Sequence, residues 1–257
     1  MSRFSNLEFG GHQEDESGRR EEVRDETYFV AQAEMAFTEG EFEPALRAWS
    51  KVLEHNPKYA GAWTGQVRML IELGEYREAR LWADKALEQF PNEAELLAAK
   101  AVALARGGDL DAALVFSDNA IEERGNTPYI WLARGDVLLA RQEKRAEYSF
   151  EKAVRLAPGN WVPLWLTARA YFFYHRIVLA MQHAQQGLAL DAGRGMLWLQ
   201  AGQCQLALGL VAPARLSLEQ AQQLLPRSAL VAEARRKAAE TSIGARLRGR
   251  LRGMFGS

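Results

Sequence analysis

Residue types that most often carry catalysis or bind metals are sparse in this chain. It contains four histidines, His12, His55, His175 and His183, and one cysteine, Cys204. They do not fall at the spacing of a zinc site, and one cysteine cannot build a disulfide framework. The HExxH, GxSxG and GxxxxGK[ST] motifs are absent from the sequence. We therefore expect no enzyme activity, no metal, no cofactor and no small-molecule substrate, and we interpret Cys204 as a small core residue.

The C-terminal residues 241–257 form a basic amphipathic pattern with four arginines and no acid. On a helical wheel the apolar side chains share one face and the arginines lie outside it. We predict that this tail contacts an anionic membrane surface or an acidic partner helix. The alternatives are a solubilising tail without a partner, a last helix that closes the fold, or a nucleic-acid contact. The predicted contact residues are Arg246, Leu247, Arg248, Arg250, Leu251, Arg252 and Phe255.

The overall charge argues against a nucleic-acid partner, because 32 Lys and Arg residues balance 33 Asp and Glu residues, a net charge of −1. Residues 1–26 hold four basic and eight acidic side chains, and we predict that 1–25 is an acidic, disordered segment. Its Phe4, Leu7 and Phe9 are candidates to dock in a groove and mask it, the alternative being an undocked end.

No apolar run follows a basic patch at the start of the sequence, so we see no pattern of a secretory signal. The expected location is cytoplasmic, or peripheral at the inner face of a membrane.

An internal repeat of about 34 residues organises the rest of the chain. The search for such a period comes first because it decides the whole architecture. Six alanines mark it, separated by gaps of 34, 34, 33, 34 and 34 residues: Ala45, Ala79, Ala113, Ala146, Ala180 and Ala214. Glycines recur five residues before four of these alanines, at Gly40, Gly74, Gly108 and Gly209. This regularity predicts one supersecondary unit, copied six times.

Each repeat reads as two helices joined by a short turn. Trp63, Val67 and Leu70 lie at i, i+4 and i+7, which places them on one helical face. Ala79 and Ala83 begin a similar face in the second half of the same repeat. The glycines suit the turn because they accept positive φ. One helix pair cannot bury its apolar face alone, so stacked pairs are needed for a continuous core.

In these features the chain resembles the tetratricopeptide repeat (TPR) family. The resemblance implies an all-α, right-handed superhelix of six repeats, 26–59, 60–93, 94–127, 128–160, 161–194 and 195–228, followed by a cap helix over 229–240 and the tail 241–257. It is weakest in the fifth repeat, where His175 replaces the turn glycine and Ala192 replaces the final proline. The third repeat has Gly125 in that proline position.

The resemblance also implies a site. In this family the first helices line a concave groove that holds a peptide or a partner helix. Some relatives grip a chaperone's C-terminal carboxylate with Lys and Asn side chains, but Val30 and Glu34 occupy those places here, so we do not expect that binding. Carried over by position, the predicted groove contacts are Arg68, Leu132, Asp136, Trp165, Arg169 and Phe172, and the adjacent Phe173 of the fifth repeat joins them.

The fifth repeat is the richest part of this predicted groove. It combines Trp161 and Trp165 with Arg169, the composition of interface hot spots. The alternative is that Trp165 and Phe172 pack against neighbouring helices. The sequence thus predicts a non-catalytic adaptor for a protein partner. A membrane-associated adaptor targeted by the tail, or a subunit of a nucleic-acid-handling complex, are the alternatives.

Overall fold

The computed structural model describes residues 25–123 and 126–241. The predicted acidic segment up to residue 24, Gly125 and the tail from residue 242 onward lie outside these residues. All regular secondary structure in the described ranges is helical, which confirms the predicted all-α class. The number of repeats stays a prediction. The chain divides into two compact units, residues 1–141 (unit 1) and 142–257 (unit 2).

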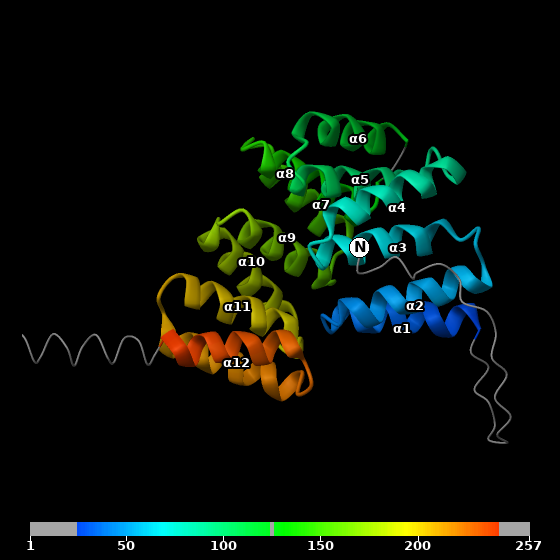
Figure 1. Ribbon diagram of the computed structural model, residues 1–257. Coiled ribbons are helices and arrows are strands. Elements are labelled where there is room, and N and C mark those ends of the chain that lie inside the picture. The colour runs from blue at the N-terminus through cyan, green and yellow to red at the C-terminus, as the bar shows by residue number, and fades with distance from the viewer. Residues whose placement is uncertain (1–24, 124–125, 242–257) are drawn as a thin grey trace, which may run out of the picture. The chain divides into compact units, whose positions relative to one another are not determined.

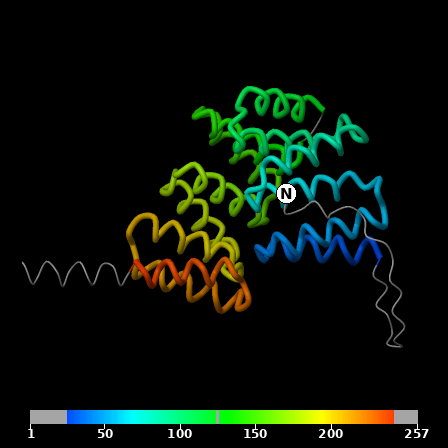
Figure 2. Tube along the Cα trace, in the orientation of Figure 1, coloured from blue at the N-terminus to red at the C-terminus, as the bar shows by residue number. Residues whose placement is uncertain are grey.

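Unit 1 contains seven helices among its described residues, and each reverses the direction of the one before it (Figures 1 and 2). Helices α3 and α5 pack side by side, as do α5 and α7. The bounds are α1 (Glu26–Thr38), α2 (Phe42–His55), α3 (Ala60–Glu72), α4 (Tyr76–Gln89), α5 (Ala94–Arg106), α6 (Leu110–Glu122) and α7 (Pro128–Ala140).

Unit 2 repeats the same alternation. Helix α9 packs on α10, α10 on α11, and α11 on α12, and α9 also reaches α11. A further helix spans 229–241 and follows α12. The labelled helices are α8 (Ala146–Leu156), α9 (Val162–Phe173), α10 (Ile177–Leu190), α11 (Gly195–Ala207) and α12 (Val211–Leu224).

The repeated alanines lie where two helices approach most closely. Ala45, Ala79, Ala113, Ala180 and Ala214 are all completely buried, and Ala146 is 3% exposed. Larger side chains at these positions would hold the backbones apart, which explains the strict register of a small residue. Gly65 on α3 shows the same constraint, because a Cβ there would lie 2.5 Å from the Trp49 ring on α2.

The turns between paired helices need a left-handed backbone. Gly40, Gly74, Gly108 and Gly209 have φ of 77°, 81°, 94° and 76°, as their predicted role requires. In the fifth repeat His175 takes the same conformation, with φ of 58°. The fifth repeat therefore has the same turn geometry with histidine in place of glycine. The left-handed backbone of His175 costs free energy, which the packing around the turn offsets.

The loops between helix pairs are held by tryptophan indoles. Trp63 Nε1 donates a hydrogen bond to the Pro57 carbonyl at 2.9 Å, and Trp198 Nε1 donates to the Ala192 carbonyl at 2.8 Å. In both cases the acceptor lies six residues earlier, just before the helix that carries the tryptophan. A buried or half-buried indole N–H requires a partner, and here it also fixes the entry of a first helix.

Candidate functional site

Arg68 occupies the centre of an aromatic and charged cluster on the first helices of unit 1. Its guanidinium carbon lies over the Tyr129 ring at 4.1 Å from the centroid, and over the Phe37 ring at 5.3 Å. These residues come from α3, α7 and α1. A guanidinium at this distance is attracted by the electron-rich ring faces. The cluster therefore joins three first helices around one cation.

Helix α5, which lies between α3 and α7, makes this contact possible. At the positions of the repeat that hold the predicted groove contacts Leu132, Asp136 and Phe172 in other repeats, α5 has Ala98, Val102 and Ala105, all at least 95% buried. Longer side chains on this face would fill the space across which Arg68 and Tyr129 meet. The alanine-rich sequence of α5 thus allows Arg68 and Tyr129 to meet across it.

The donors of Arg68 are available. No hydrogen bond or ion pair joins its guanidinium to the residues that the structure describes, although the side chain is half-buried. Burial raises the pKa of Tyr129, which keeps its hydroxyl neutral; the Arg68 charge opposes this rise, and Glu95 and Glu72 add to it. Glu95 also accepts a hydrogen bond from the Thr127 hydroxyl at 2.6 Å. The cluster is thus a positive centre with a carboxylate rim.

Two of the predicted groove contacts in unit 1 are buried instead. Asp136 is 4% exposed, and its Oδ2 accepts hydrogen bonds from Arg106 Nη2 at 2.7 Å and Nε at 3.2 Å. Leu132 is 7% exposed. The prediction that these side chains lie open to a partner is therefore wrong. A buried carboxylate needs a matched cation, and Asp136 joins α7 to α5 through this ion pair.

The aromatic residues of unit 2 form a stack that lies mostly inside the protein. The Trp161 and Trp165 centroids are 5.6 Å apart, with 39° between the ring planes. Arg169 lies over Trp165 at 5.5 Å, and Arg194 lies over Trp161 at 5.4 Å. The stack therefore runs from one guanidinium through two indoles to another.

The prediction that Trp161 and Trp165 are exposed to a partner is wrong, because both side chains are buried. Trp165 is completely buried and Trp161 is 7% exposed, so these rings serve the packing, as the alternative interpretation held for Trp165. Arg169 and Phe172 are half-buried, and Phe173 is 38% exposed. Only these last three residues of the predicted patch retain surface that a partner can reach.

Sequence reasoning missed Tyr129 and Arg194. One signal existed for Tyr129, because the equivalent positions 34 and 68 residues earlier hold Glu95 and Gly61. A large aromatic at a position that is polar or small in the two preceding repeats marks a departure from them. Arg194 lies in a loop between helix pairs and carried no such signal.

Other chemically versatile groups are enclosed. Cys204 is fully buried, and burial raises the pKa of its thiol to about 11, which disfavours the reactive thiolate. The His183 ring stacks on Tyr171 with centroids 5.4 Å apart, and burial lowers its pKa. Within residues 25–123 and 126–241 no group of His, Cys, Asp or Glu side chains has a metal-binding arrangement.

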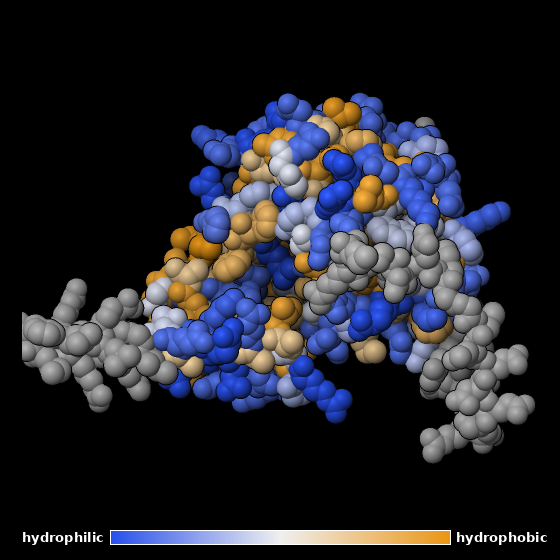
Figure 3. All heavy atoms as spheres, viewed as in Figure 1, coloured by the Kyte–Doolittle hydropathy of each residue, from blue (hydrophilic) through white to orange (hydrophobic). Residues whose placement is uncertain are grey.

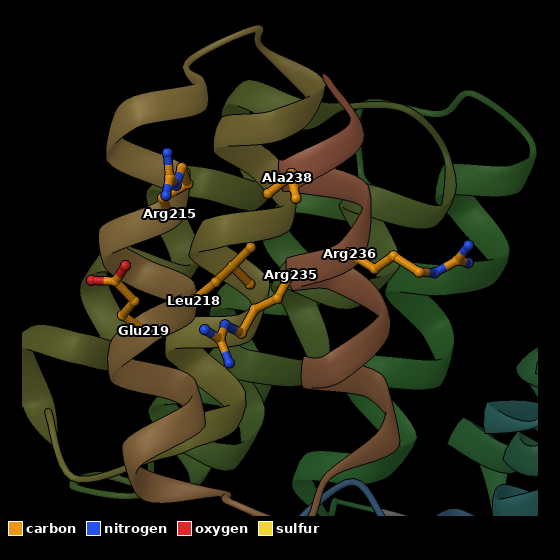
Figure 4. A pocket seen from close by; sticks show the side chains of 7 residues that line it. Arg215, Leu218, Glu219, Arg235, Arg236 and Ala238 are labelled. Atoms are coloured by element: carbon orange, nitrogen blue, oxygen red, sulfur yellow. The ribbon is translucent and has the colours of Figure 1, made fainter. Parts of the chain in front are cut away.

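A basic cleft lies between α12 and helix 229–241 (Figure 4). Its volume is about 290 Å³. Leu218 lies between the two helices, while Arg236 points away from α12 (Figure 4). Three arginines and one carboxylate line it together with the apolar residues: Arg215, Leu218, Glu219, Arg235, Arg236, Ala238 and Ala239.

Comparison with known proteins agrees with this architecture. The family model for the tetratricopeptide repeat matches residues 36–103. A TPR protein from Parabacteroides merdae superimposes with a TM-score of 0.55 at 16% identity, covering 85% of this chain and 86% of that one. A thermophilic TPR protein of Thermus thermophilus gives 0.54 at 20% identity, covering 70% and 99% of the two chains.

A longer structure has the same fold in part. A chain of the Cut9–Hcn1 hetero-tetramer of the APC/C gives a TM-score of 0.51 at 16% identity; the match covers 85% of this chain but 44% of that one. No curated protein has a significant sequence match. Residues 36–103 match the tetratricopeptide repeat family model, and the chain has the fold of tetratricopeptide repeat proteins.

Proposed function

We propose that this protein is a non-catalytic scaffold that holds a segment of a protein partner against the first helices of unit 1. The observation that carries the proposal is Arg68. Its guanidinium is oriented by two aromatic rings, and it has no hydrogen bond or ion pair to the described residues. An arginine in this state is ready to bind, because little side-chain entropy remains to be lost.

The chemistry of the cluster defines what the segment must offer. Planar N–H donors match a carboxylate or a backbone carbonyl, and a carboxylate is bound in a bidentate manner. The rings of Phe37 and Tyr129 offer apolar contact on either side of that polar anchor. Glu72 and Glu95 repel a strongly acidic segment. We therefore expect a segment with one acceptor group flanked by apolar residues.

A second contact area is proposed on unit 2. Arg169, Phe172 and Phe173 end α9 and keep part of their surface. The Arg169 guanidinium packs on the buried ring of Trp165. The proposed role of Trp165 is thus to position Arg169.

Affinity capture from native extract tests the proposal, with quantitative comparison of the wild-type chain and Arg68→Ala. Lys85→Ala is the matched control, because Lys85 also lies over an aromatic ring, Trp82 at 5.1 Å, but on the second helix α4. We expect the partner yield to fall at least about tenfold for Arg68→Ala, the loss expected for a charge-assisted contact, and to stay unchanged for Lys85→Ala.

The captured protein is then mapped to a peptide, and its affinity for both variants is measured by titration calorimetry. Circular dichroism checks that both proteins are folded. If folded wild type and folded Arg68→Ala bind the peptide with equal affinity, the partner binds elsewhere. Loss of binding in both variants would point to a contact that is not specific to the first helices.

A further inference from the structure

Unit 2 exposes large apolar side chains at the turns that join its paired helices. Val178 is 69% exposed, Leu210 49%, Leu208 43% and Phe173 38%. They flank the α9–α10 and α11–α12 turns. Because α9 packs on α11 and each partner helix runs antiparallel, both turns lie at one edge, which we call the turn edge. Figure 3 shows apolar residues gathered over α9 and α10.

The repeat fold does not require these apolar residues. At the residue that precedes each second helix, unit 1 has Glu41, Glu75 and Asp109. Unit 2 has Arg176 and Leu210 at the same position of the repeat. Exposed apolar side chains gathered in one place mark a surface that is covered in use.

Two arginines lie near the turn edge. Arg176 follows the α9–α10 turn, and Arg215 lies one helical turn into α12. Neither forms an ion pair with any residue of the described ranges. At the start of unit 2, Glu143 is neutralised by Arg145, with Oε2 and Nη2 2.5 Å apart. The edge therefore combines apolar surface with unpaired positive charge.

The chain returns to this edge before its end. Helix 229–241 runs antiparallel to α12, so that residue 241 lies at the end where α12 begins. The basic cleft opens within two turns of that point. Arg246, Arg248, Arg250 and Arg252 of the predicted tail lie outside the described residues.

We propose that the turn edge of unit 2 docks on an anionic lipid surface. The apolar side chains protrude from two separate turns, a form that enters the headgroup region without a complementary cavity. Arg176 and Arg215 supply attraction to anionic headgroups. An acidic protein surface would need pockets for each protruding side chain. This contact is distinct from the proposed Arg68 site, which lies on first helices of unit 1.

Vesicle co-sedimentation of the full-length chain tests the proposal. The probes are vesicles of phosphatidylcholine with about 30% phosphatidylglycerol, and vesicles of phosphatidylcholine alone, at low salt. The variant Val178→Glu/Leu210→Glu places two carboxylates at the edge and leaves the tail intact. The matched control is Leu81→Glu/Val115→Glu in unit 1, whose side chains are 53% and 56% exposed.

We expect binding to the anionic vesicles only, reduced at least about tenfold by the edge variant and unchanged by the control. Should the edge variant fail to fold, Arg176→Glu/Arg215→Glu takes its place and is expected to weaken binding as strongly. Absence of wild-type binding, or equal binding of edge and control variants, would overturn the proposal.

Analytical ultracentrifugation without vesicles tests whether the turn edge instead binds a second copy of the chain. A wild-type dimer that the edge variant dissociates would assign the edge to a second copy of the chain and exclude the lipid contact. Failure of this proposal leaves the Arg68 site untouched, because Arg68→Ala is measured on protein capture and not on vesicles.

Discussion

The Arg68 guanidinium carbon lies 4.1 Å from the centroid of the Tyr129 ring, although 61 positions separate the two residues. The contact spans two first-helix spacings, from α3 across α5 to α7. It fixes an arginine that has no hydrogen-bonding partner among the described residues, which is why the proposed site centres on it.

Tyr129→Leu should lower the free energy of unfolding by about 1–2 kcal/mol, because the cation–π contact and part of the ring packing are lost. Tyr129→Phe keeps the ring and should change the stability by less than about 0.5 kcal/mol. Urea unfolding followed by tryptophan fluorescence compares the two variants. Equal losses would show that the hydroxyl, and not the ring, matters.

Trp165→Ala should destabilise the protein by about 3–5 kcal/mol, since it opens a cavity at a fully buried side chain. Phe173→Ala, at an exposed ring of the same helix, should cost less than about 1 kcal/mol. Thermal unfolding by circular dichroism measures both. A small effect at Trp165 would contradict the burial described above and would return the ring to the candidate contacts.

Asp136→Ala should cost about 3–5 kcal/mol, because it leaves the Arg106 charge buried without its carboxylate. The matched control is Asp111→Ala, which removes the partner of Arg141 at 2.9 Å but at a fully exposed carboxylate. We expect no measurable change there. Similar urea midpoints for the two variants would mean that the buried pair contributes no more than the exposed one.

His175→Gly should stabilise the protein by about 0.5–1 kcal/mol, because φ of 58° is strained for a side chain with a Cβ and natural for glycine. Gly74→Ala is the converse change. Nothing lies within 4 Å of the Cβ position at Gly74, so only its φ of 81° is at issue, and a loss of about 1 kcal/mol is expected. Changes of the same sign in the two variants would refute the backbone explanation.

The pH dependence of stability should change in His183→Gln. Burial lowers the pKa of His183 below its ordinary 6.5, against the opposing effects of Gln186, Glu147 and Glu151. At low pH the unfolded chain therefore binds the proton more readily than the folded one. Stability from this group is complete above pH 6.5 and is lost as the pH falls through the folded pKa. Urea midpoints at pH 7.5 and 5 should differ less for the variant; an equal difference would exclude His183 as the cause.

The sequence alone determined the helical repeat of this protein. The six alanines in register meet a local requirement for a small residue where two helices pack. The four turn glycines meet a local requirement for one left-handed residue. Both patterns can therefore be recognised in the sequence without the structure. The burial of the alanines and the positive φ of the glycines follow directly. For the same reason the sequence identifies His175 as the residue that replaces a turn glycine.

Tertiary structure alone decided which groove-facing residues reach solvent. Trp165 and Phe173 lie on the same helix with similar composition around them, yet one is buried and the other is 38% exposed. Spacing at i, i+4 and i+7 identifies a face, but what covers that face depends on side chains from other helices. The Arg106–Asp136 pair and the Arg68–Tyr129 contact arise in this way, because each joins residues whose proximity depends on how successive first helices pack.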